Sequence, residues 1–183
     1  MRALSKNEIA NIVQEGKRIS EKEGAVILDQ FEKSQPELYQ AIFGTLSDGI
    51  AEENLDMAHL FLDLCFDIIW VYKNAFGNPP MVELAEDWFS NKIGLLDAEL
   101  KSLSKDIPMN AKFRKRLNER FIARSIEAGI QLELLQYLDE QVQNYASFNR
   151  SRKKATHITN NLLFVVARLM DELYAQSLQV DNF

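Results

Sequence analysis

Apolar residues recur at intervals of three and four along nearly the whole chain, and no stretch of any length alternates apolar with polar residues. Intervals of three and four mark one face of an α-helix, whereas alternation marks a half-buried strand. The pattern therefore predicts an all-α protein, a single-domain bundle of five or six mostly antiparallel helices over residues 1–183. The expected helices cover residues 5–33, 36–47, 50–76, 80–103, 110–147 and 150–178.

Capping and breaking residues set the expected boundaries. Ser5 is followed three residues later by Glu8, which is the pattern of a capping box at a helix start. Gly24 lies inside the first apolar pattern, where we expect a bend. Gly77-Asn78-Pro79-Pro80 is the strongest break, because glycine suits a helix C-terminus and proline does not continue a helix. Residues 130–183 contain neither glycine nor proline, which favours two long helices there.

Composition narrows the class of protein. The chain has 183 residues, of which 46% are hydrophobic and 26% charged, so it has enough apolar side chains for a packed core and is not a disordered chain. Its one cysteine, Cys65, cannot form an internal disulfide and is expected in the core. The most apolar stretch, residues 60–72, is interrupted by Asp63 and Asp67 and is too short to span a membrane. These features predict a soluble, cytoplasmic protein with no membrane partner.

Charge is unevenly distributed along the chain. The net charge is −6, which argues against a general nucleic-acid binder. Residues 1–104 hold 9 basic and 18 acidic side chains, whereas residues 105–154 hold 11 basic and 6 acidic ones. The chain thus has an acidic first half and a basic segment after it, so any anionic partner is expected at the basic segment.

The helix expected over residues 50–76 is apolar nearly all round, which predicts a central, buried helix. At 100° per residue its polar side chains fall on one narrow stripe. We call this the acidic stripe, and its members are Glu52, Asp56, His59, Asp63, Asp67 and Asn74. The simplest interpretation is that the stripe is the only solvent-facing side of this helix.

The acidic stripe also suggests a metal or acid–base site. Asp56 and His59 are three residues apart, as carboxylate and imidazole ligands are in helical-bundle metal centres, and Asp63 and Asp67 would extend the ligand set. A di-metal centre needs a second carboxylate–histidine pair, and His157 is followed by Asn160 and Asn161 instead. No cofactor is therefore predicted, and a divalent metal is kept only as an alternative.

Cations are concentrated at two places in the basic segment. The first is a ladder at strict intervals of four, whose like charges repel one another unless they are solvated or face an anionic surface. The ladder consists of Lys112, Arg116, Arg120 and Arg124. Because the acidic stripe has nearly the same pitch, we hypothesise that stripe and ladder face each other, within one chain or across a dimer.

The second concentration of cations lies at the start of the last expected helix and comprises Arg150, Arg152, Lys153 and Lys154. It could bind an acidic protein segment or phosphates, although no recognisable nucleic-acid-binding motif accompanies it. On the last helix, Phe164 falls on a polar face, opposite the expected buried side, among His157, Asn161, Arg168 and Asp171. An aromatic side chain at such a position is expected to mark a contact with a partner or with another part of the chain.

No nucleophile, nucleotide-binding or zinc motif is present, so the sequence favours a binding protein over an enzyme. We expect an adaptor, regulator or accessory subunit that acts by protein–protein interaction and self-associates as a dimer. Its predicted interaction residues are Lys112, Arg116, Arg120, Arg124, Arg152, Lys153 and Phe164. The alternatives are a metal- or small-ligand-binding protein or enzyme that uses the acidic stripe, and a binder of nucleic acid or of an acidic partner through the two basic clusters.

Overall fold

The computed structural model describes residues 1–80 and 131–180, and in these residues all regular structure is helical. The prediction of an all-α helical bundle is confirmed. The elements are α1 (Lys6–Gly16), α2 (Glu21–Ser34), α3 (Pro36–Gln40), a π-helical segment (Ala41–Leu46), α4 (Ser47–Ala51), α5 (Leu55–Phe76), α8 (Leu132–Ser147), a 3-10 helix (Arg150–Lys154) and α9 (Thr156–Val180).

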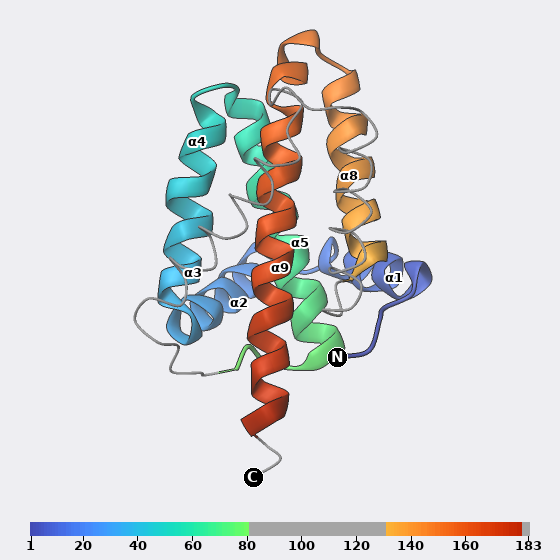
Figure 1. The fold of residues 1–183 in the computed structure, drawn as a ribbon, viewed down its shortest axis with the longest axis vertical. Helices are drawn as coiled ribbons and strands as arrows, with labels where there is room; N and C mark the ends of the chain where they lie inside the picture. The colour runs from blue at the N-terminus through green and yellow to red at the C-terminus, as the bar shows by residue number, and fades with distance from the viewer. Residues whose placement is uncertain (81–130, 181–183) are drawn as a thin grey trace, which may run out of the picture.

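Helices α5 and α9 form the centre of the described fold (Figure 1). Helix α8 packs beside α9, and the continuous column from α3 to α4 lies on the other side, with α4 packed on α5. Helices α1 and α2 lie across one end, where α1 contacts both α5 and α8. The α4–α5 and α8–α9 connections both turn at the opposite end of the bundle, which brings two loops far apart in sequence to one surface (Figure 1).

The core confirms the prediction that the helix after residue 50 is central and buried. The fully buried side chains of α5 include Phe61, Ile68 and Tyr72, and Cys65 is buried among them as expected. Burial raises the pKa of the Cys65 thiol well above its usual value, so this sulfur is an apolar packing group. In the part of the chain that the structure describes, no helix is both long enough and apolar enough to cross a membrane.

The expected first helix, 5–33, is two helices, and the expected bend at Gly24 is wrong. The chain breaks between Gly16 and Ser20, and Gly24 lies inside the continuous helix α2. The reason is a second capping box: the Ser20 side chain accepts a hydrogen bond from the Glu23 backbone, and the Glu23 side chain accepts one from the Ser20 backbone. Ser5 and Glu8 form the same box at the start of α1, as predicted.

The next boundaries also differ from those expected. The column that begins at Pro36 continues through a π-helical segment to Ala51, so the expected end at residue 47 is too early. Helix α5 then begins at Leu55 instead of residue 50, because the Asn54 side chain caps it by accepting from the Met57 backbone N–H at 3.0 Å. Its end at Phe76 is as predicted, with Gly77 at the C-terminal cap and a φ of 97°.

The later helices agree only in part with the bounds predicted from the sequence. Helix α8 ends at Ser147, as predicted for the helix over 110–147, but it begins only at Leu132, because Gln131 is not helical. The expected helix is therefore interrupted at Gln131, and residues 110–130 lie outside the described part of the chain. The helix expected over 150–178 begins as a 3-10 turn and becomes α-helical only at Thr156. The helix expected over 80–103 lies outside the described residues apart from its first position.

Replacing Gly16 with alanine should destabilise the protein, although alanine is the better helix former. A Cβ at position 16 would lie 2.8 Å from the Trp70 ring, and Trp70 Nε1 donates to the Ile12 carbonyl oxygen at 2.8 Å. Moving the indole should cost about 1–3 kcal/mol, which exceeds the helix-propensity gain of about 1 kcal/mol. Urea unfolding measures the loss. The matched control is Gly24→Ala, whose new Cβ would make only an ordinary contact with Phe66 at 3.8 Å, so a loss equal to that of Gly16→Ala would contradict this prediction.

Candidate interaction surface at the tip of the α8–α9 hairpin

The connection between α8 and α9 is a short, internally hydrogen-bonded turn. After α8 ends at Ser147, the Asn149 Oδ1 atom accepts hydrogen bonds from the backbone N–H and the hydroxyl of Ser151, both at 3.0 Å. An asparagine side chain that caps the following residues in this way starts the 3-10 helix at Arg150. The turn therefore has a defined shape, which fixes where its cations project.

Arg152 attaches this turn to the rest of the bundle. Its Nη2 and Nε atoms lie 2.8 and 3.1 Å from the Asp56 Oδ2 atom at the start of α5, and its Nη1 donates to the Tyr145 carbonyl oxygen at 3.2 Å. The guanidinium carbon also lies 3.9 Å from the centre of the Tyr145 ring. Only 17% of the Arg152 side chain is exposed. Arg152 thus holds two helices together and is not available as a free surface cation.

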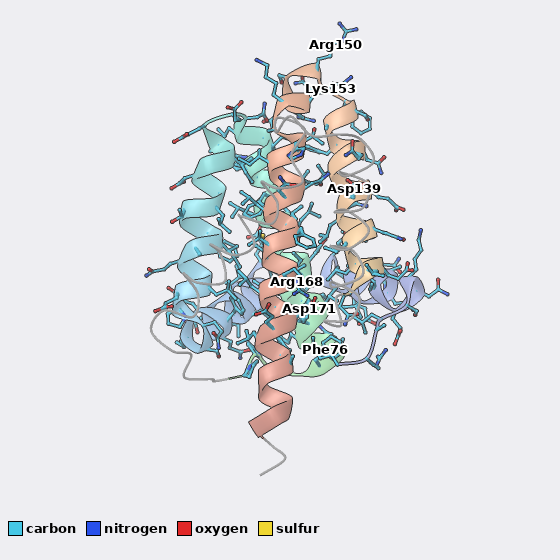
Figure 2. All side chains as sticks on the ribbon, in the orientation of Figure 1. Phe76, Asp139, Arg150, Lys153, Arg168 and Asp171 are labelled. Carbon is cyan, nitrogen blue, oxygen red and sulfur yellow. The ribbon has the colours of Figure 1, made fainter. Side chains whose placement is uncertain are left out.

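The remaining cations of the turn are exposed, and a large aromatic side chain lies beside them. Phe148 is 84% exposed, the highest value among the large apolar residues described, and Arg150, Lys153 and Lys154 are exposed. Figure 2 shows Arg150 and Lys153 projecting from the extreme end of the bundle. Leu55, next to the Asp56 anchor, is 60% exposed. We call Phe148, Arg150, Lys153 and Lys154 the hairpin tip.

The acidic stripe does not form one site. Asp56 is paired with Arg152, His59 and Asp63 are exposed, and Asp67 is buried, with its Oδ2 atom accepting from the Tyr137 hydroxyl at 2.7 Å. The stripe is thus solvent-facing except at Asp67, which α8 covers, and Asn74 beyond it is exposed again. Among residues 1–80 and 131–180 the structure shows no group of three or more His, Cys, Asp or Glu side chains arranged to hold a metal ion.

The face of α9 around Phe164 is not the polar surface that the sequence predicted. Asp171, expected there, is only 1% exposed, and only 13% of the Arg168 side chain is exposed. Phe164 is half-buried and packs against the hydrophobic core. The expectation failed because helical periodicity separates two faces of a helix, whereas α9 is enclosed on most of its circumference. A partner contact through Phe164 stays a prediction.

The structure also contains a buried polar cluster that the sequence did not reveal. The Asp171 Oδ1 atom accepts from the Tyr72 hydroxyl at 2.6 Å, and Figure 2 shows Asp171 and Arg168 close together on α9. Burial raises the pKa of Asp171 to about 7, against the opposing effects of Tyr72, Arg168, the Gln131 backbone N–H and the N-terminal amino group. Among the described residues, Asp171 Oδ2 and Arg168 Nη1 are buried without a hydrogen-bond partner.

The cation ladder of Lys112, Arg116, Arg120 and Arg124 lies outside the described residues, so its pairing with the acidic stripe stays a hypothesis. What the structure does show is that Asp56 of the stripe pairs with a cation of the second cluster, Arg152. Comparison of the chain with protein-family models, with curated proteins and with solved structures found no match.

Proposed function

We propose that the protein is a non-enzymatic, cytoplasmic interaction protein, an adaptor, regulator or accessory subunit, whose hairpin tip binds an acidic segment of a partner protein. The observation that carries this proposal is the 84% exposure of Phe148 beside three exposed cations on a well-held turn. An aromatic side chain left in water forgoes about 1.5–3 kcal/mol of possible burial free energy, which a docking partner would recover.

The arrangement of the tip supports binding through an apolar anchor surrounded by charge. Phe148 would supply buried area, and Arg150, Lys153 and Lys154 would attract carboxylates and set the orientation of the partner. Because Arg152 and Asn149 hold the turn in place, little ordering entropy is lost on binding. The tip thus combines affinity, charge preference and preorganisation in one short segment.

The charge balance favours an acidic protein over nucleic acid. The chain as a whole carries −6, which repels a polyphosphate backbone, and the tip offers three free cations over one turn of chain. A short acidic and apolar peptide needs only a local cationic patch. We also keep self-association within this proposal. The exposed Glu52 and Glu53 belong to the α4–α5 connection, which turns at the same end of the bundle as the tip (Figure 1), so a second copy of the chain offers an acidic surface to the tip.

A fluorescently labelled peptide that alternates glutamate with leucine tests the proposal by anisotropy. Wild type should bind it, with affinity that falls as salt is raised from about 0.05 M to about 0.5 M. Phe148→Ala should weaken binding about tenfold or more, and the double change Lys153→Glu with Lys154→Glu should do the same. The matched controls are Val26→Ala, an exposed apolar position on α2, and Arg18→Glu, an exposed cation between α1 and α2; both should bind like wild type.

Three results would count against the proposal or redirect it. Equal binding by the tip variants and wild type would overturn it. Binding of phosphatidylserine vesicles or of a single-stranded oligonucleotide through Phe148 and the lysines, with no binding of the peptide, would replace a protein partner with a membrane surface or a nucleic acid. A dimer in native mass spectrometry that dissociates only in the tip variants would identify the acidic partner as a second copy of the chain.

A further inference from the structure

A cleft of about 360 Å³ lies where α1, α5 and α8 meet, on a different part of the surface from the hairpin tip. It is lined by Lys17 just after α1, by Leu60, Asp63, Leu64, Phe66 and Asp67 of α5, and by Tyr137 and Gln141 of α8. A second groove of about 250 Å³ between α1 and α8 shares Lys17 and Tyr137 with it.

The cleft contains a buried carboxylate, and one of its two oxygen atoms accepts a hydrogen bond. Asp67 is 8% exposed, and its Oδ2 atom accepts from the Tyr137 hydroxyl at 2.7 Å. Among the described residues no cation lies within ion-pair distance of this carboxylate, and burial raises its pKa because the charged form lacks solvation. The hydrogen bond from Tyr137 fixes the orientation of the carboxylate, and among the described residues no hydrogen bond to Oδ1 is present.

The other residues that line the cleft indicate the chemical character of the rest of the ligand. Leu60, Leu64 and Phe66 supply apolar surface, while Asp63 adds a second, exposed carboxylate near the opening. The single cation of the lining, Lys17, is exposed and leaves the cleft with an excess of negative charge. An anionic ligand would meet two carboxylates here, and a neutral one would leave Asp67 without a counter-charge.

We propose that this cleft binds a small organic cation, a primary ammonium compound with an apolar body, whose ammonium group pairs with Asp67. The apolar body lies against Leu60, Leu64 and Phe66, and Asp63 strengthens the attraction from the opening. The inference is independent of the function proposed for the hairpin tip, because it uses none of the same residues. It assigns to Asp63 and Asp67 a ligand contact in place of the metal alternative suggested by the acidic stripe.

The probe is phenethylammonium, titrated into ¹⁵N-labelled protein and followed by amide chemical shifts. A ligand of this size in a partly open cleft should bind with a Kd of about 1 mM and shift amides of residues 60–67 and 137–141. The neutral analogue 2-phenylethanol and the anion 3-phenylpropionate should bind at least about tenfold more weakly, because neither pairs with Asp67.

Two variants test the contact from opposite directions. Asp67→Asn keeps an oxygen that accepts from Tyr137 but removes the charge, and it should weaken phenethylammonium binding about tenfold. Lys17→Gln removes an exposed cation at the opening and should strengthen binding a few-fold, which also keeps the test valid if Asp67→Asn folds poorly. Glu32→Gln, an exposed carboxylate on α2 away from the cleft, is the matched control and should leave binding unchanged.

Equal binding of phenethylammonium and 2-phenylethanol would overturn the proposal, since the cleft would then be an apolar site without charge selectivity. Unchanged binding by both Asp67→Asn and Lys17→Gln would overturn it as well. Neither outcome would bear on the hairpin tip, whose peptide assay uses different residues and a different readout.

Discussion

Asp171→Asn should remove much of the decrease in stability that the protein undergoes as pH rises from about 4 to about 7. The Asp171 carboxyl is 1% exposed, and burial raises its pKa from 3.8 to about 7. Between these two values the unfolded chain releases the proton while the folded protein keeps it. Folding then favours the protonated form, so the free energy of unfolding falls with rising pH and levels off above about pH 7.

The size of the effect follows from the size of the shift. A rise of the pKa from 3.8 to about 7 lowers the free energy of unfolding by about 4 kcal/mol over the whole pH window. Asparagine has nearly the same shape, and its side-chain oxygen accepts from the Tyr72 hydroxyl as Asp171 Oδ1 does. The variant should therefore gain stability relative to wild type across the window, reaching its largest advantage above pH 7.

Urea unfolding at half-unit intervals of pH measures this difference directly. Other carboxyl groups also make stability depend on pH. The pKa of Asp67 is raised by burial, and those of Glu8 and Glu23 are lowered by hydrogen bonds in the capping boxes. Their contributions are the same in variant and wild type, so they cancel in the difference. Asp48→Asn, an exposed carboxylate on α4, is the control and should run parallel to wild type. A constant difference between Asp171→Asn and wild type from pH 4 to pH 8 would show that Asp171 ionises normally in the folded protein.

Gln131→Leu should release the N-terminal segment from the bundle and lower the stability of the fold. The Gln131 side chain is 1% exposed and makes two hydrogen bonds to this segment: its Oε1 accepts from the Leu4 backbone N–H at 2.8 Å, and its Nε2 donates to the Arg2 carbonyl oxygen at 3.0 Å. Leucine fills a similar volume but leaves both backbone groups without these partners. We expect a loss of about 2–4 kcal/mol, since each unsatisfied buried group costs about 1–3 kcal/mol.

Amide hydrogen exchange distinguishes a local release from general destabilisation. In Gln131→Leu the Leu4 amide should exchange much faster than in wild type, by a larger factor than the core amides of α5. Gln136→Leu changes an exposed glutamine on α8, the helix that follows Gln131; it is the matched control and should leave both stability and the Leu4 amide unchanged. Equal protection of the Leu4 amide in Gln131→Leu and wild type would contradict the assigned role of Gln131.

Gln131 and Asp171 lie in the same region of the fold. The Gln131 backbone N–H is one of the groups that oppose the raised pKa of Asp171, and its side chain holds the N-terminal segment. Tyr72, which lies on α5, connects that helix to this region. Its hydroxyl donates to Asp171, and its ring packs against Tyr174 of α9 at a centroid distance of 5.4 Å. Four separate parts of the chain therefore meet around two polar side chains, which explains why single changes there should have large effects.

The hairpin tip was the part of the candidate site that local sequence could indicate. The run from Arg150 to Lys154 was visible as a basic cluster, because charge density is a property of neighbouring residues. Its division into one structural cation and three exposed ones was not, since it depends on Asp56, which lies far away in the chain but 2.8 Å from Arg152 in the fold. Phe148 was missed because a single aromatic residue after a helix does not reveal its own exposure.

The same distinction holds for the cleft and for the buried cluster. The spacing of Asp63 and Asp67 placed both on one side of α5, but only the packing of α8 buries Asp67 under Tyr137 and leaves Asp63 in solvent. Asp171 was expected on a polar face because helical periodicity reports the chemical character of a face and not what covers it. Nothing in the local sequence indicates that Tyr72 reaches it.

The sequence by itself determined the all-α class, the buried character of α5, the end of that helix at Phe76 and the capping box at Ser5. Each of these follows from interactions within a few residues, namely helical periodicity, capping hydrogen bonds and the backbone limits of glycine and proline. The tertiary structure alone decided which charged groups are paired, buried or free, because that depends on contacts between helices distant in the chain. Candidate function rests on those groups, so it became visible only when α5, α8 and α9 were packed together.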